Sequence, residues 1–228
     1  MANRHLQEVS LVIPTLNASA TLPETLAVVA GAARETIVVD GGSRDETVDI
    51  ARSAGATLIS TNRGRGTQLA AGARAAGGDW LMFLHADSVP QPGWEDRLAE
   101  FTSDPANRER AAVFRFAIDI DLRLARRMER NVAWRSRVLG LPYGDQGLVI
   151  GRAFYDSLGG FRDIPIMEDV DLVRRVGRRR LVILDATMTT SGVRYRRKGI
   201  IARSLRNLTC LGMYFLGIPP RMIARLYG

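Results

Sequence analysis

The chain has 228 residues, of which 46% are hydrophobic and 25% charged, and its formal net charge is +8 at pH 7. This length and apolar content suit one globular domain with a sizeable core and disfavour intrinsic disorder. One cysteine, Cys210, excludes an internal disulfide framework and a cysteine zinc cluster. The N-terminus lacks the apolar core of a signal peptide, and no segment offers about 18 uninterrupted apolar residues. We therefore expect a cytoplasmic protein.

Basic residues gather late in the chain, in RRVGRRR at 174–180 and in RYRRKG at 194–199. A surplus of positive charge is typical of proteins that bind nucleic acid, an anionic membrane surface or small polyanions such as nucleotides. No helix-turn-helix, zinc-finger or RNP-like pattern accompanies these charges. The sequence therefore favours a nucleotide or a membrane surface as the partner, and we expect no nucleic acid.

The first 90 residues alternate short apolar runs with helical stretches. β-Branched and apolar residues continue without a polar face in four runs, which predicts buried strands at 9–13, 36–40, 56–60 and 80–84. Helices are predicted at about 21–33, 45–54 and 66–76. This order predicts an α/β fold with a mainly parallel, Rossmann-like sheet flanked by helices, and ligands at the carboxyl ends of its strands.

The four predicted strand ends lead into IPTLNAS, VVDGGSRDET, STNRGRG and FLHADS. Neither a dinucleotide-binding fingerprint nor a P-loop is present. Acids instead follow the second and fourth strands, an arrangement that suits the base, ribose and diphosphate of a nucleotide. A simpler interpretation stays open for each acid, because Asp40 precedes two glycines that favour a turn and Asp87 could cap the next helix. We expect Ser43 and Asp45 to cap the helix at 45–54.

Several segments of this chain resemble the family 2 glycosyltransferases, and they occur in the family's order over roughly residues 9–190. The segments are LVIPTLNASATLPETL, IVVDGGSRDET, GRGTQLAAGA, FLHADS, LPYGDQG and IMEDVDL. The resemblance looks closest to a small bacterial subgroup, the selenodomain-associated or arsenosugar-type glycosyltransferases. It implies an inverting enzyme of the GT-A fold, of the hexosyltransferase type, that takes its sugar from a nucleotide-sugar donor.

On the donor side, the resemblance implies a row of nucleotide-binding residues. They are Pro14, Thr15, Asp40, Arg63, Arg65 and His85. Asp87 corresponds to the last acid of the family's Asp-x-Asp triplet, which binds a divalent metal across the two phosphates. We expect Mg²⁺ or Mn²⁺ as the cofactor, because phosphates and water can supply the other oxygen ligands. His85 replaces the first acid of the triplet, and both ligand contact and simple space filling stay open for it.

On the acceptor side, inverting transfer requires a carboxylate that takes the proton of the acceptor hydroxyl. The resemblance of PIMEDVDLVRRV to the family's acidic pair implies Asp169 as this base, with Glu168 beside it in the acceptor or sugar pocket, although acids also stabilise a helix start. LPYGDQG supplies Tyr143, Asp145 and Gln146 for an acceptor or sugar pocket. A turn at Gly144-Asp145 explains that segment equally well.

The end of the chain departs from many relatives of this type. The Gln-x-x-Arg-Trp signature of processive synthases is absent, which favours one sugar per turnover, and the only histidines are His5 and His85. Arg194, Arg196 and Arg197 lie in a loop that is predicted to close over the diphosphate as a lid. The amphipathic tail that follows fits three interpretations, namely a membrane surface, a homodimer interface or a cover for the core.

We therefore expect one GT-A-like domain over 1–228, with a nucleotide-binding part at about 9–90, a catalytic part at about 110–190 and a basic tail at about 194–228. It would move one sugar from a UDP- or GDP-sugar to a small or lipid-linked acceptor, in the cytoplasm or at the inner face of the membrane. The alternative is a catalytically silent module of the same fold that binds a nucleotide or an anionic membrane. A nucleotidylyltransferase is disfavoured because IPTLNASAT lacks its Gly-rich, Arg-containing signature.

Overall fold

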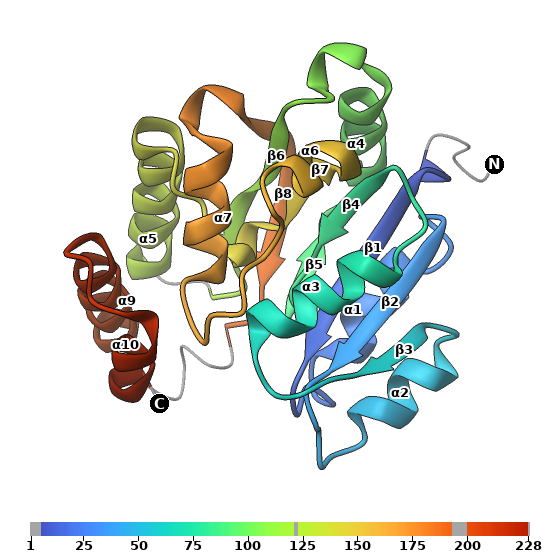
Figure 1. Ribbon diagram of the computed structural model, residues 1–228, viewed down its shortest axis with the longest axis horizontal. Helices are drawn as coiled ribbons and strands as arrows, with labels where there is room; N and C mark the ends of the chain where they lie inside the picture. The colour runs from blue at the N-terminus through green and yellow to red at the C-terminus, as the bar shows by residue number, and fades with distance from the viewer. Residues whose placement is uncertain (1–5, 121–122, 193–199, 228) are drawn as a thin grey trace.

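The computed structural model describes residues 6–120, 123–192 and 200–227, and in these ranges one mixed eight-stranded sheet lies between helices (Figure 1). The strands are β1 (Val9–Thr15), β2 (Glu35–Asp40), β3 (Thr57–Ser60), β4 (Trp80–Phe83), β5 (Ser88–Pro90), β6 (Ala111–Ile118), β7 (Leu148–Gly151) and β8 (Leu181–Thr190). The helices are α1 (Leu22–Val29), α2 (Thr47–Ser53), α3 (Arg65–Ala75), α4 (Trp94–Ser103), α5 (Arg123–Trp134), α6 (Arg152–Ser157), α7 (Glu168–Val176), α9 (Ile200–Phe215) and α10 (Pro220–Tyr227). The strand order across the sheet is β3-β2-β1-β4-β7-β6-β8-β5.

The first half of the sheet has the predicted architecture. β1 pairs in parallel with β2 and β4, and β2 pairs in parallel with β3. Along β1, Leu11 and Ile13 pack with α1, α2 and α4, whereas Val12 packs with α3, α6 and α7 on the opposite face. Apolar residues therefore have to occupy both faces of the strand, which explains why the run has no polar face. The predicted strands and helices of this half are confirmed, with ends that differ by a few residues.

Helix α3 lies unusually close to the sheet because a glycine faces it. A Cβ at Gly72 would come within 2.3 Å of Val12 Cγ1 and 3.0 Å of Val39 Cγ2. The glycine lets the helix pack directly on β1 and β2. The Ala-rich segment that predicted this helix thus also sets its distance from the sheet.

The second half of the sheet is mixed. β7 is antiparallel to both β4 and β6, β6 is parallel to β8, and β5 is antiparallel to β8. Four of the seven pairings in the described chain are parallel, which agrees with the expected mainly parallel sheet. The register between β6 and β8 shifts between Val113 and Arg115. This half carries the elements that form the acceptor side of the site.

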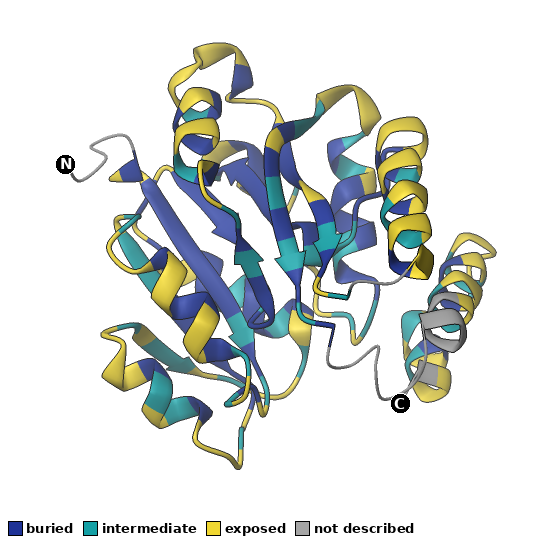
Figure 2. Ribbon diagram, turned by 180° about the vertical axis from the view of Figure 1, so that it is seen from behind, coloured by how far each residue is buried: buried dark blue, intermediate teal, exposed yellow. Residues whose placement is uncertain are grey.

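Helices α9 and α10 pack against α7 and the segment before β7 and form one side of the molecule (Figure 1). Their inner faces contribute Cys210, Leu211 and Ile223 to a cluster with Leu141 and Val170. Cys210 is buried in this cluster, with an exposed fraction of 2%. The outer faces of the two helices are largely exposed (Figure 2). None of the helices in the described ranges has the length and apolar character needed to cross a bilayer.

Candidate active site

Two adjoining cavities lie at the carboxyl ends of the parallel strands. The larger has a volume of about 680 Å³ and runs from the end of β1 to the start of α3 and to α10. The smaller, of about 100 Å³, lies between the turn after β4, the start of α7 and α9. Arg65, His85, Asp87 and Ile166 line both. We call the larger the donor cleft and the smaller the acceptor cavity.

Most of the predicted nucleotide-binding residues line the donor cleft. They are Pro14, Thr15, Arg63, Arg65 and His85. Gln68 of α3 supports this wall, because its buried Nε2 donates to the carbonyl oxygens of Thr15 and Val39, each at 2.7 Å. The amide thus links the ends of β1 and β2.

Asp40 requires a correction, because its carboxylate is used inside the protein and does not line the donor cleft. Oδ2 accepts hydrogen bonds from the backbone of Gly42 and Ser43, and Oδ1 accepts from the hydroxyls of Thr15 and Ser43. Burial alone would raise the pKa of Asp40, but these hydrogen bonds outweigh it and lower the pKa. The turn interpretation therefore describes Asp40 in this structure.

Ser43 differs from its predicted capping role, whereas Asp45 accepts from the backbone nitrogen of Thr47, the first residue of α2. The residue at the N-cap position, Glu46, makes no side-chain capping bond. Asp45 accepts from the backbone nitrogens of Thr47 and Ser19, and the Ser43 hydroxyl accepts from the backbone of Asn17. These two side chains join the loop after β2 to the loop after β1, because both loops leave the same edge of the sheet.

The segment His85-Ala86-Asp87 forms the turn between β4 and the short strand β5. Helix α4 begins only at Trp94, so Asp87 does not cap a helix. The Asp87 carbonyl accepts from the backbone of Ser191 at 2.9 Å, and the Ala86 carbonyl accepts from the Thr25 hydroxyl at 3.2 Å. The turn is thus fixed from β8 and from α1, and it places Asp87, with an exposed fraction of 9%, between the two cavities.

Asp169 lies in the first turn of α7 and lines the acceptor cavity. Its Oδ2 accepts from the backbone nitrogen of Gly144 at 2.8 Å, and its Oδ1 accepts from that of Val170 at 2.7 Å. The residue before the helix, Met167, has φ of 66°, a left-handed conformation that is unfavourable for a side chain other than glycine. Such strain is typical of functional sites, and here it precedes the acidic pair.

His85 and Asp169 both approach Gly144. A Cβ at position 144 would come within 2.6 Å of His85 Nε2 and 3.5 Å of Asp169 Oδ2. Only glycine allows the imidazole to approach this segment so closely. Gly144 thus lies between the turn after β4 and the start of α7, and His85 lines both cavities.

Glu168 is almost fully buried beside Asp169, with an exposed fraction of 1%. Its Oε1 lies 3.3 Å from the guanidinium of Arg65, although this contact lacks hydrogen-bond geometry. Burial raises the pKa of Glu168 to about 7, and the positive charge of Arg65 partly opposes the rise. Glu168 thus joins α7 to the donor side and does not line the acceptor cavity itself.

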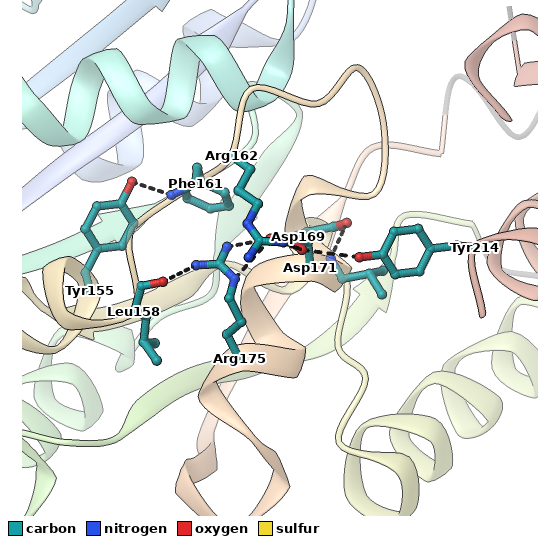
Figure 3. Close-up of polar contacts among 9 residues, drawn as sticks. Tyr155, Leu158, Phe161, Arg162, Asp169, Asp171, Arg175 and Tyr214 are labelled. Atoms are coloured by element: carbon teal, nitrogen blue, oxygen red, sulfur yellow. Dashed lines mark hydrogen bonds and ion pairs between the residues drawn. The ribbon is translucent and has the colours of Figure 1, made fainter. Parts of the chain in front are cut away.

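Asp171, one turn further along α7, has a structural role (Figure 3). Its Oδ1 pairs with Arg162 at 3.0 Å, and its Oδ2 pairs with Arg175. The hydroxyl of Tyr214 on α9 donates to the same carboxylate at 3.3 Å. The three acids of the helix start therefore have different surroundings, and only Asp169 lines the acceptor cavity.

In the segment 141–147, Tyr143 and Asp145 line the acceptor cavity. The Arg135 guanidinium stacks on the Tyr143 ring, 3.4 Å from its centre, and donates to the Leu141 carbonyl at 2.7 Å. Burial raises the pKa of Asp145 to about 6; Arg135 opposes the rise, whereas Asp169 and Asp87 add to it. Asp145 Oδ1 is buried and has no hydrogen-bond partner, which marks it as a group available to a ligand.

Gln146 requires a correction as a pocket residue. Its Oε1 accepts from the Ser136 hydroxyl at 2.9 Å, and its Nε2 donates to the Phe114 carbonyl at 3.0 Å. The amide is buried, with an exposed fraction of 1%, and supports the turn that carries Asp145. Asp145 and Gln146 are adjacent in sequence, yet Asp145 lines the cavity and Gln146 has a structural role. Contacts with distant segments cause this difference, and no local sequence pattern indicates them.

Several residues that complete the cavities were not predicted from the sequence. Thr190 and Ser191 at the end of β8 and Asn207 of α9 line the acceptor cavity, and Arg221 of α10 lines the donor cleft. Asn207 Oδ1 is buried without a hydrogen-bond partner. The basic character of the tail was the only signal for Arg221. The predicted lid residues Arg194, Arg196 and Arg197 lie outside the described residues.

The junction of the cavities offers one carboxylate, that of Asp87, to a hard divalent cation. Asp87 faces both cavities, and its charge contributes to the raised pKa of Asp145. Across the described residues, no group of three or more His, Cys, Asp or Glu side chains is arranged to hold a metal. A metal here would therefore take Asp87 from the protein and its other ligands from phosphate and water, which is a usual arrangement for Mg²⁺.

Two solved structures show that this is a GT-A-like fold. A mannosyltransferase from Pyrobaculum calidifontis, in complex with GDP-Man and Mn²⁺, matches with a TM-score of 0.61 and 22% identity over 80% of this chain and 56% of that one. Glucosyl-3-phosphoglycerate synthase from Mycobacterium tuberculosis, in complex with Mn²⁺, UDP and glucosyl-3-phosphoglycerate, matches with a TM-score of 0.56 and 21% identity over 81% and 70% of the two chains.

The sequence comparison identifies the family. Residues 10–157 match the model of glycosyl transferase family 2, and the chain belongs to that family. A PGL/p-HBAD biosynthesis glycosyltransferase of Mycobacterium bovis (strain BCG) is 39% identical over 106 residues, which cover 42% of this chain. The match spans 41% of that relative, so the chain corresponds to about two fifths of its length. The resemblance to family 2 and the GT-A fold is thereby confirmed.

Proposed function

We propose that this protein transfers one sugar from a nucleotide-sugar donor to an acceptor hydroxyl, with inversion at the anomeric carbon. The observation that carries the proposal is that the donor cleft and the acceptor cavity meet at Arg65, His85 and Asp87, with the Asp169 carboxylate facing the smaller cavity. The larger cavity has the volume of an ordinary ligand site. Membership of glycosyl transferase family 2 supports this reaction class.

The donor would lie in the larger cavity, with its diphosphate towards the junction. Pro14 and Thr15 contribute the wall for the base, and Arg63 and Arg65 are suited to phosphate or to stacking on a base. The complexes of the structural relatives with GDP-Man and with UDP support a UDP- or GDP-sugar as donor. A bound Mg²⁺ or Mn²⁺ would neutralise charge on the leaving diphosphate, and Asp87 is the residue placed to hold it.

Asp169 is the proposed general base. Its two backbone hydrogen bonds, from Gly144 and Val170, hold the carboxylate in one orientation at the cavity wall. The acceptor oxygen would form a bond to the anomeric carbon while the bond to the diphosphate oxygen breaks, and the hydroxyl proton would pass to Asp169. The diphosphate leaves with the electron pair of the broken bond.

Tyr143, Asp145 and Asn207 form the proposed pocket for the acceptor or the transferred sugar. Two unpartnered oxygens, Asp145 Oδ1 and Asn207 Oδ1, support this role because a carbohydrate hydroxyl can satisfy both. Glu168 is proposed to act through Arg65, which it pairs with beside the donor cleft. The lid of Arg194, Arg196 and Arg197 remains a prediction.

Four further expectations from the sequence are also proposals. They are one domain over 1–228, the selenodomain-associated or arsenosugar-type subgroup, a small or lipid-linked acceptor, and a cytoplasmic location at the inner face of the membrane. They rest on the sequence resemblance and on the tail.

The test is nucleoside diphosphate release from a panel of UDP- and GDP-hexoses, each with Mn²⁺, with Mg²⁺ and with a chelator. We expect slow, metal-dependent hydrolysis of at least one donor, because water can replace the acceptor. A silent binding module would instead give binding without release. Thermal shifts identify such binding, since a ligand at 100 times its dissociation constant stabilises by about 2.7 kcal/mol. Stabilisation without any release, with and without candidate acceptors, would refute the proposed activity.

A further inference from the structure

The outer face of α9 and α10 carries a concentration of exposed large apolar side chains. They are Leu205, Leu208, Phe215, Leu216, Met222 and Leu226, with exposed fractions between 48% and 82%. Leu205, Leu208 and Phe215 lie along one side of α9. Met222 and Leu226 are four positions apart and lie along one side of α10. We call this set the tail face. The opposite sides of the two helices are buried, so the exposed residues are not needed to hold the helices in place.

The tail face is also cationic. Arg225 is exposed on α10, near Met222 and Leu226, and the sequence contains no Asp or Glu after Asp185. Exposed apolar residues beside an arginine, with no acids nearby in the sequence, give a surface complementary to anionic headgroups over acyl chains.

An apolar groove continues the tail face towards α7. It has a volume of about 540 Å³ and is lined chiefly by apolar residues of α9, α7 and the segment before β7, among them Leu139, Leu208 and Phe215. Arg174 and Arg178 add positive charge to its wall, and the Arg174 guanidinium lies 4.9 Å from the centre of the Phe215 ring. The groove therefore presents an apolar surface to hydrocarbon and, beside it, positive charge to anionic groups.

We propose that the protein docks on an anionic lipid bilayer through the tail face, with α9 and α10 lying in the interface. A second copy of the chain is a poorer fit, because a twofold dimer would bring this face against itself and place arginines opposite arginines with no acids to pair them. A lipid surface supplies both the negative charge and the apolar layer that the face lacks.

Docking would have a consequence for the site, and this consequence rests on the proposed function. Arg221 and Ala224 of α10 line the donor cleft, and Asn207 of α9 lines the acceptor cavity. The helices that meet the bilayer therefore also form walls of both cavities.

The test is co-sedimentation of the full chain with vesicles of phosphatidylcholine alone and of phosphatidylcholine mixed in equal parts with phosphatidylglycerol. We expect binding to the anionic vesicles at low salt, and release as salt screens the charges over a Debye length of about 8 Å. Leu208→Ser combined with Leu226→Ser should weaken binding at least about tenfold, because each leucine loses apolar burial. Arg225→Gln should weaken it about fivefold.

Matched changes on distant helices serve as controls. Val28→Ser on α1 removes an exposed apolar residue, Arg52→Gln on α2 removes an exposed charge, and both should bind vesicles as the unmodified protein does. Melting temperatures verify that every variant folds. No binding at low salt, or undiminished binding by the double leucine variant, overturns the proposal. Light scattering measures the oligomeric state in the absence of vesicles. A dimer that dissociates when Leu208 and Leu226 are replaced would overturn the proposal, because the tail face would then bind a second copy of the chain. The vesicle assay does not depend on catalysis, so failure of the proposed activity leaves its result unaffected.

Discussion

The donor and acceptor sides of the site are built in different ways. On the donor side, consecutive parallel βα units bring successive strand ends to one edge, so residues such as Thr15 and His85 take their places through the order of the sheet. On the acceptor side, contacts between distant segments place each group. The Gly144 backbone orients Asp169, Ser191 fixes the Asp87 turn, and Tyr214 contacts Asp171.

This difference shows which positions depend on the regular fold and which depend on a few specific contacts. Strand ends follow from hydrophobic patterning, whereas the acceptor cavity depends on glycine and on backbone conformation at Gly144 and Met167. We therefore expect donor binding to tolerate changes on the acceptor side, and we expect transfer to be sensitive to them.

The largest effect is expected for Asp169→Asn, which separates transfer from donor binding. The amide cannot accept the acceptor's proton, and loss of general-base assistance costs about 10²- to 10⁴-fold in rate. Donor affinity, measured by calorimetry, should stay nearly unchanged. Asp171→Asn is the control in the same helix: it disrupts the pairs with Arg162 and Arg175 and should lower stability by about 3 kcal/mol without a selective loss of turnover. Near-normal transfer by Asp169→Asn would remove this residue as the base.

Asp87→Ala should abolish the dependence of donor affinity on Mn²⁺ or Mg²⁺. In the presence of metal, affinity should fall at least about tenfold, because the metal contributes several kcal/mol of charge stabilisation at the phosphates. Calorimetry with and without metal measures both values. Asp49→Ala on α2 removes an exposed acid far from the site and should leave both unchanged. Retained metal-dependent affinity in the Asp87 variant would contradict its assignment as the ligand.

Asp145→Asn should make the protein more stable and less active. The carboxyl has a folded-state pKa of about 6 against an ordinary value of 3.8, so the unfolded chain loses its proton first and wild-type stability falls as pH rises between these values. The amide removes this cost, with a gain on the order of 2 kcal/mol above pH 6 that vanishes towards pH 4. Denaturant unfolding across that range, in chelator-treated buffer, measures the gain. An equal stability difference at pH 4 and pH 7 would show that the buried charge is not its source.

The smallest effect is expected for Arg65→Gln, because the arginine is about half exposed and its pair with Glu168 is partly screened. Removing its charge should raise the pKa of Glu168 above its value of about 7. Because the folded-state pKa of Glu168 is raised, the free energy of unfolding falls as pH rises above about 4.5. In the variant this fall should continue beyond pH 7, and the additional loss should be less than about 1 kcal/mol. The pH dependence of denaturant unfolding reveals the shift. Identical profiles for variant and wild type would mean that Arg65 does not interact with Glu168 in solution.

How much the sequence predicts differs between the same two sides. The strands β1, β2 and β4 follow from apolar runs and were predicted in place, and five of the six nucleotide-binding residues that the family resemblance implied line the donor cleft. Asp40 was assigned to the nucleotide because its local context fits both a turn and a ligand. The hydroxyls of Thr15 and Ser43 donate to the Asp40 carboxylate and favour the turn interpretation. The local sequence does not show how many hydrogen bonds a carboxylate accepts in the folded protein.

The sequence by itself determined the parallel half of the sheet and the acidic groups at its edge, because hydrophobic periodicity and helix starts are local properties of the chain. Only the tertiary structure decided which of those groups line a cavity. Asp145 and Gln146 are neighbours in sequence, yet one has an unpartnered oxygen at the acceptor cavity and the other is bonded to Ser136 and Phe114. Their roles differ because hydrogen bonds from segments ten and more residues away use the polar atoms of one and leave those of the other available.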